Sequence, residues 1–175
     1  MGAPVVSVLT VDDYEPSRYA QSRALRALGY RVLEAKDGRT ALELAVREHP
    51  DILLLDVHLP DLHGFEVCQQ LKADARTADI PVIHHSATGR GDRFRRESAA
   101  VGAFAYLQEP VSPDELLRVL RLALQASRKL RGASSALREG TTEGRTRSRS
   151  AGAATKKPRQ IAPAAGPSSP RKRSR

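Results

Sequence analysis

Short apolar runs alternate with amphipathic segments along residues 5–126, and this alternation limits what the chain can fold into. The runs are continuous and end at charged or turn residues, which is typical of strands buried on both faces. Between them, apolar residues recur every three or four positions, which predicts helices. The pattern therefore predicts an α/β fold with a doubly wound, five-stranded parallel sheet flanked by five helices. The expected strands are residues 5–11, 31–35, 52–55, 81–83 and 104–107.

Local signals mark where several helices begin and end. Pro16 suits the first turn of a helix, and Gly29 follows directly after its last apolar position. The strongest start signal is Ser112-Pro113-Asp114-Glu115, which combines a capping box with proline at the first helical position. The sequence therefore predicts helices over residues 16–28, 37–46, 65–71, 91–101 and 112–124.

Charge divides the chain into two parts. The 175 residues include 29 basic and 20 acidic side chains, for a net charge of +9. Residues 129–175 hold 13 of the basic side chains but only two of the acidic ones, and all seven aromatic residues precede them. A segment so poor in apolar residues cannot bury enough surface to fold. We therefore expect one domain over residues 1–128 and a basic, low-complexity, disordered tail over residues 129–175.

Composition excludes several classes of protein. The single cysteine, Cys68, cannot form an intrachain disulfide, and no cluster has the spacing of zinc ligands. No run approaches the roughly 18 consecutive apolar residues that a membrane-spanning helix needs. The N-terminus also lacks the basic region of a secretory signal. We therefore expect a cytoplasmic protein without a membrane span.

Acidic residues gather where the expected strands end. Asp12 and Asp13 follow the first strand, Asp56 follows the third, and Glu109 follows the fifth. In an open parallel sheet, the carboxyl ends of the strands form the edge at which sites lie. Any one acid after a strand can be a helix cap, but carboxylates 4 Å apart repel by about 4 kcal/mol per pair at an effective dielectric near 20. Several acids at one edge therefore favour a cation, and Mg²⁺ suits oxygen ligands shared with phosphate.

Four motifs, in their order and spacing, resemble the receiver domain of bacterial two-component response regulators. They are LTVDDYEPSR, PDILLLDVHLPDLHGFEVCQQLK, IPVIHHSA and GAFAYLQEPVSPDELL. The resemblance covers residues 5–126 and implies the flavodoxin-like receiver fold. It also implies a signalling phosphoacceptor and not a turnover enzyme, although such a domain contributes to its own phosphotransfer and dephosphorylation.

The resemblance assigns a phosphoacceptor and a metal site. Asp56 matches the aspartate that accepts a phosphoryl group from a phosphohistidine on a sensor histidine kinase or phosphotransfer protein. Asp12 and Asp13 match the acidic pair that binds Mg²⁺ together with Asp56, and the backbone carbonyl of His58 completes the protein ligands. The chemistry agrees, because a carboxylate forms an acyl phosphate when metal and amides neutralise the charge.

Further residues match the parts that bind the phosphoryl group and respond to it. Ser86 matches the hydroxyl that moves to a phosphoryl oxygen, and the backbone amide of Ala87 donates a second hydrogen bond. Tyr106 matches the aromatic residue that rotates inward when that hydroxyl moves. Pro110 follows the position of a cis peptide bond in the family, so Glu109-Pro110 is a candidate for a cis bond.

Glu109 departs from the family pattern. The family has lysine directly before this proline, where the ammonium group pairs with the phosphoryl oxygens, so the charge is inverted here. One hypothesis is that Glu109 turns outward and Asp56 is phosphorylated with a weaker structural response. A second is that the domain is a pseudo-receiver, an adaptor that binds its partner regardless of phosphate. A third is that Glu109 joins the acidic cluster and strengthens cation binding.

The mode of output follows from what the sequence lacks. No helix-turn-helix pattern follows the receiver-like part, so we expect no sequence-specific DNA binding. Output then takes place by protein contact, through the face of the fourth helix, fifth strand and fifth helix. The basic tail is either a solubilising extension or a non-specific binder of nucleic acid or anionic membranes. A Mg²⁺-dependent phosphohydrolase is disfavoured, because the chain offers no suitable lysine near the later strands and no cap insertion.

Overall fold

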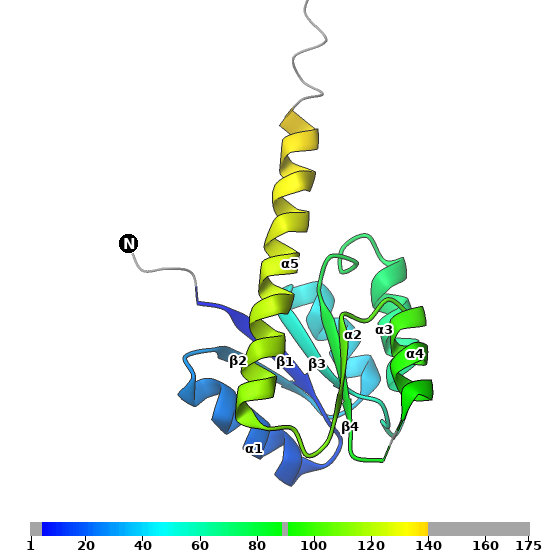
Figure 1. Cartoon of the computed structure of the whole chain (residues 1–175). Coiled ribbons are helices and arrows are strands. Elements are labelled where there is room, and N and C mark those ends of the chain that lie inside the picture. The colour runs from blue at the N-terminus through cyan, green and yellow to red at the C-terminus, as the bar shows by residue number, and fades with distance from the viewer. Residues whose placement is uncertain (1–4, 89–90, 140–175) are drawn as a thin grey trace, which may run out of the picture.

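A five-stranded parallel sheet forms the centre of the structure (Figure 1), a computed structural model that describes residues 5–88 and 91–139. The strand order is β2-β1-β3-β4-β5, and every neighbouring pair is parallel. This order confirms the doubly wound sheet that the sequence predicts. The strands are β1 (Ser7–Val11), β2 (Arg31–Ala35), β3 (Ile52–Asp56), β4 (Val82–Ser86) and β5 (Ala105–Gln108).

In the described part of the chain, four helices connect the five strands and a fifth follows β5, and together they cover both faces of the sheet (Figure 1). On one face lie α1 (Glu15–Ala27) and α5 (Pro113–Glu139). On the other lie α2 (Gly38–Glu48), α3 (Gly64–Ala73) and α4 (Asp92–Ala100). All five helices fall where the sequence predicts helices, including the arginine-rich α4.

Side-chain caps begin three of the helices. The Asp37 side chain accepts a hydrogen bond from the Thr40 amide at 2.8 Å at the start of α2. The Ser112 hydroxyl accepts one from the Glu115 amide at 3.2 Å at the start of α5, as the sequence predicts. At α3 the cap is His63, which forms a capping box with the glutamate three residues later. A histidine cap is not an ordinary signal, so the sequence analysis did not identify this one.

An apolar cluster packs on each face of the sheet, and single strands contribute to both. From β3, Leu53 and Leu55 enter the cluster beneath α2 and α3, whereas Ile52 and Leu54 enter the cluster beneath α1 and α5. All four side chains are buried. Burying an aliphatic side chain of this size stabilises the fold by about 1.5–3 kcal/mol. Burial on both faces explains why the strands read as continuous apolar runs and not as alternating ones.

The first residue of α3 lies directly against the end of β3. A Cβ atom at Gly64 would overlap the backbone carbonyl oxygen of Asp56 and lie 2.8 Å from the Cα atom of Val57. The Gly64 amide donates a hydrogen bond to the Val57 carbonyl at 2.8 Å. Only glycine permits this close approach. It ties the start of α3 to the strand end that carries Asp56.

The last helix is longer than the sequence analysis expected. It extends to Glu139, whereas we expected the low-complexity tail to begin at residue 129. Lysine, leucine, arginine and alanine in residues 129–139 are good helix formers, which is compatible with this extension. The remainder of the expected disordered tail, residues 140–175, lies outside the described residues, and the domain boundary after residue 128 stays a prediction. Among the described helices, none is both long and apolar enough to span a membrane.

Candidate functional site

Three aspartates meet at the carboxyl edge of the sheet. Asp12 and Asp13 directly follow β1, and Asp56 is the last residue of β3, the neighbouring strand. One carboxylate oxygen from each residue lies within 4.8 Å of those of the other two. Asp12 is buried, Asp56 is partly buried and Asp13 is exposed, so the cluster opens to solvent on one side. The structure thus brings together three of the four acidic residues that the sequence places at strand ends.

Backbone amides orient two of these carboxylates. Asp12 Oδ1 accepts a hydrogen bond from the Tyr14 amide at 2.8 Å, and Asp56 Oδ1 accepts one from the His58 amide at 3.2 Å. Burial raises the pKa of Asp56, while the nearby His85 and the amide hydrogen bonds act in the opposite direction. Asp56 is therefore a partly desolvated carboxylate that a backbone amide orients.

The chemistry of this cluster fits Mg²⁺. Carboxylates at these separations repel one another unless a cation lies between them. Mg²⁺ binds through one or two carboxylates, retains several water molecules and accepts phosphate oxygens as ligands. The open side of the Asp12, Asp13 and Asp56 cluster leaves room for both. The further ligand expected from the sequence, the His58 carbonyl, stays a prediction.

The residues expected to bind the phosphoryl group lie beside the aspartates. In the pairing of β3 with β4, Asp56 is opposite the residue that precedes Ser86, the last residue of β4. Ser86 is buried, and Ala87 after it is exposed. Tyr106, on the neighbouring β5, is also buried. Burial raises the pKa of its phenol, and a side-chain hydrogen bond with Ser86 partly opposes that rise. The Tyr106 hydroxyl therefore contacts Ser86, although the roles of the three residues stay predictions.

A row of aromatic rings runs from the loop after Asp56 toward β5. His58 and His63 lie 5.6 Å apart between ring centroids, and His63 and Phe65 lie 4.9 Å apart. Phe94 of α4 is 6.3 Å from Phe65 and 6.3 Å from Tyr106. These rings connect the loop after Asp56 with the side of the domain formed by α4 and β5.

Glu109 does not join the aspartate cluster. Its amide donates a hydrogen bond to the Ser86 carbonyl at 3.1 Å, so its backbone lies beside the expected phosphoryl-binding residues. Its carboxylate lies 2.9 Å from Nδ1 of His85, and this hydrogen bond lowers the pKa of Glu109 even though burial acts in the opposite direction. The Glu109–Pro110 peptide bond is cis, as the resemblance implies.

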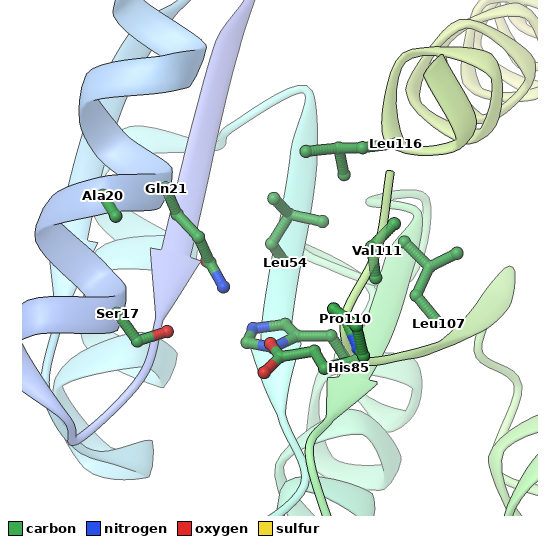
Figure 2. A pocket seen from close by; sticks show the side chains of 10 residues that line it. Ser17, Ala20, Gln21, Leu54, His85, Leu107, Pro110, Val111 and Leu116 are labelled. Atoms are coloured by element: carbon green, nitrogen blue, oxygen red, sulfur yellow. The ribbon is translucent and has the colours of Figure 1, made fainter. Parts of the chain in front are cut away.

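His85 is the residue of this region that the sequence analysis missed. Its side chain faces α1 and α5, where it helps to line a cavity of about 270 Å³ together with Gln21, Leu54 and Glu109 (Figure 2). The side chain is only 5% exposed. Within the described residues, its Nε2 atom has no hydrogen-bond partner. The preceding residue, His84, is buried as well.

His84 points to the opposite face of the sheet. Its Nδ1 atom lies 2.8 Å from the Ser98 hydroxyl of α4, and its Nε2 atom lies 3.3 Å from the Gly64 carbonyl of α3. Burial lowers the pKa of His84 to about 4. As expected from strand geometry, the two histidines cannot bind one metal ion together. His84 is a structural residue that joins α3, α4 and β4.

The fold and the aspartate cluster together define a receiver domain. The response regulator receiver domain family matches residues 8–121, and the chain belongs to this family. It is therefore a signalling domain of the two-component type, as the sequence motifs predict.

Individual relatives agree with this assignment. The phosphate regulon transcriptional regulatory protein PhoB of Pseudomonas aeruginosa is 39% identical over 119 residues, which cover 68% of this chain and 52% of PhoB. Response regulator PleD of Caulobacter vibrioides is 44% identical over 105 residues, which cover 59% of this chain and 23% of PleD. The chemotaxis protein CheY4 of Vibrio cholerae superimposes with a TM-score of 0.65 at 32% identity, over 69% of this chain and all of that chain. The chain thus spans about half or less of these two longer relatives.

Proposed function

We propose that the protein is the phosphoacceptor of a two-component or phosphorelay pathway, in which Asp56 receives a phosphoryl group from a sensor histidine kinase or phosphotransfer protein. The observation that carries this proposal is the cluster of Asp12, Asp13 and Asp56, whose carboxylate oxygens lie within 4.8 Å of one another at the carboxyl edge of the sheet. Membership of the receiver family supports it.

Asp56 supplies the nucleophile. One of its carboxylate oxygens attacks the phosphorus in line with the leaving imidazole, and the phosphorus–nitrogen bond breaks. The imidazole nitrogen keeps the electron pair of that bond and is left neutral or takes up a proton from solvent. An acyl phosphate remains on Asp56, oriented by the hydrogen bond from the His58 amide.

The neighbouring residues neutralise the charge of the transferred group. Asp12, Asp13 and Asp56 would hold Mg²⁺, which supplies positive charge to the phosphoryl oxygens when it is bound. The Ser86 hydroxyl and the Ala87 amide, at the end of β4, donate hydrogen bonds to the remaining oxygens. Because Tyr106 contacts Ser86, a movement of that hydroxyl changes the surroundings of the ring and, through Phe94, of α4.

Output takes place by protein contact in this proposal, from a cytoplasmic protein. The face of α4, β5 and α5 adjoins Tyr106 and presents arginines of α4, which suit an acidic partner surface. The basic tail, residues 129–175, is either a solubilising extension or a non-specific binder of anionic surfaces or nucleic acid.

Glu109 supports a second candidate function, a phosphorylation-independent adaptor. A receiver without the lysine lacks one charge partner for the phosphoryl group, and here the glutamate side chain at that position is bound to His85. In this alternative the domain binds its partner in one fixed state.

Phosphorylation by acetyl phosphate with Mg²⁺, followed by intact mass, separates the two candidates. We expect the mass of one phosphoryl group on the wild-type protein and none on Asp56→Asn. Asp114→Asn, an exposed residue in the first turn of α5, serves as a matched control and should be phosphorylated normally. No gain on a wild-type protein that binds Mg²⁺ would reject the phosphoacceptor and favour the adaptor.

A further inference from the structure

The direction of one side chain decides whether a negative charge faces the phosphoacceptor site. Glu109 begins beside that site, because its amide is bonded to the Ser86 carbonyl. Its carboxylate, however, lies 2.9 Å from Nδ1 of His85, and Glu109 borders the cavity between α1 and α5. It is outside the cluster formed by Asp12, Asp13 and Asp56.

The hydrogen bond between His85 and Glu109 has a defined polarity. An ionised carboxylate can only accept hydrogen bonds, so Nδ1 of His85 carries the proton. This holds whether or not Nε2 is also protonated. The contact is 2.9 Å long, and hydrogen bonds to a charged acceptor are stronger than those between neutral groups.

His85 is the rigid member of the pair. It lies on β4, inside the sheet, and its side chain is 5% exposed, whereas that of Glu109 is 29% exposed. Leu54 of β3 and Leu107 of β5, the two neighbouring strands, border the same cavity as the imidazole. A fixed donor therefore holds a carboxylate that could otherwise take several rotamers.

We propose that His85 is a positioning residue for phosphoryl transfer, because its Nδ1–H group holds the Glu109 carboxylate on the α1–α5 side of the sheet and away from Asp56. The inference rests on the proposed function and explains how a receiver tolerates glutamate in place of lysine. A released carboxylate would face an aspartate cluster and an incoming phosphoryl group of the same sign, and like charges in a partly buried site repel strongly.

The test measures the rate of phosphorylation by acetyl phosphate in a set of variants. His85→Leu removes the donor, and we expect the rate to fall by about tenfold, as repulsion between partly screened like charges predicts. Glu109→Gln should rescue the rate in the His85→Leu background, because it removes the negative charge. By itself, Glu109→Gln should leave the rate near that of the wild type. His85→Asn should also stay near the wild type, because the asparagine amide offers a donor near the position of Nδ1.

His84→Leu provides a matched control. This histidine is equally buried and lies on the same strand, but it faces Ser98 and Gly64 on the other side of the sheet. Any loss of rate caused by His84→Leu should not be rescued by Glu109→Gln. If His85→Leu is phosphorylated as fast as the wild type, or if Glu109→Gln fails to rescue it, the inference is overturned.

A second measurement does not depend on phosphorylation. A released Glu109 adds negative charge near the metal site, so His85→Leu should bind Mg²⁺ more tightly by about threefold to tenfold, and Glu109→Gln should reverse the change. Unchanged Mg²⁺ affinity in His85→Leu would refute the positioning role. If the wild type takes up no phosphate but His85→Leu binds Mg²⁺ more tightly and Glu109→Gln reverses that change, the proposed function fails, whereas the conclusion that His85 holds the Glu109 carboxylate away from the metal site stands.

Discussion

Protonation of His84 should destabilise the domain at mildly acidic pH. The side chain is fully buried, and both ring nitrogens are near oxygen atoms, the hydroxyl of Ser98 and the carbonyl of Gly64. Burial disfavours the charged imidazolium and lowers the pKa of His84 from 6.5 to about 4. Unfolding exposes the imidazole to water and restores its ordinary pKa, so the unfolded state binds a proton that the folded state rejects.

The sign and size of the effect follow from this difference. The stabilising contribution is fully present above pH 6.5 and is lost as the pH falls toward 4, because in this range only the unfolded state is protonated. One pKa unit corresponds to about 1.4 kcal/mol, so the free energy of unfolding should fall by roughly 3 kcal/mol over this range. That amount is a large fraction of the stability of a domain of this size.

Urea unfolding between pH 7 and pH 4, followed by circular dichroism, measures this loss. Other groups also titrate in this range, so the comparison is with His84→Leu, which should show a pH dependence smaller by roughly 3 kcal/mol. Equal pH dependence in wild type and His84→Leu would show that burial does not lower the pKa of His84, and would refute the argument.

Three further substitutions, one of them with a matched control, test the fold and the site. Gly64→Ala should destabilise the domain by about 2–4 kcal/mol and weaken Mg²⁺ binding, because the new Cβ atom overlaps the Asp56 carbonyl. Thermal unfolding measures the loss of stability, and a Mg²⁺ titration measures the loss of affinity. An unchanged melting temperature would contradict the close contact. Leu120→Ala should lower the free energy of unfolding by about 2–5 kcal/mol in a urea titration, because Leu120 is fully buried. Leu122→Ala, on the exposed side of the same helix, should lower it by less than about 1 kcal/mol. Similar losses in the two variants would contradict the packing of α5 against the sheet. Asp12→Asn should lower Mg²⁺ affinity by at least about tenfold in a fluorescence or calorimetric titration, and unchanged affinity would remove Asp12 from the metal site.

The family could be predicted from the sequence because the signals that indicate the order of strands and helices are local. Apolar runs, helix periodicity and the Ser112 cap each depend on a few neighbouring residues, and together they predict the order of strands and helices. The position of Asp12, Asp13 and Asp56 at strand ends then follows from a general property of parallel sheets. The end of α5 was harder to predict from the sequence, because residues 129–139 combine good helix formers with a low-complexity composition.

The environment of Glu109 could not be read from the sequence. Its charge and its departure from the family lysine are visible in the printed residues, but these residues leave three hypotheses open: an outward-turned Glu109 with Asp56 phosphorylated, a pseudo-receiver, and a Glu109 that joins the acidic cluster. His85 lies 24 positions away and becomes its partner only because β4 and β5 are neighbours in the sheet. A signal was present in the alternation along β4, which sends His84 and His85 to opposite faces, but it did not indicate what each histidine would meet there.

The amino-acid sequence by itself therefore determined the fold class, the family and the acidic residues of the site. The tertiary structure decided how the burial of His84 lowers its pKa, why α3 begins with Gly64 and where the Glu109 carboxylate goes. The physical reason is the range of the interactions. Periodicity and capping act between residues close in the chain, whereas desolvation, steric contact and ion pairing depend on which distant segments the folded sheet brings together.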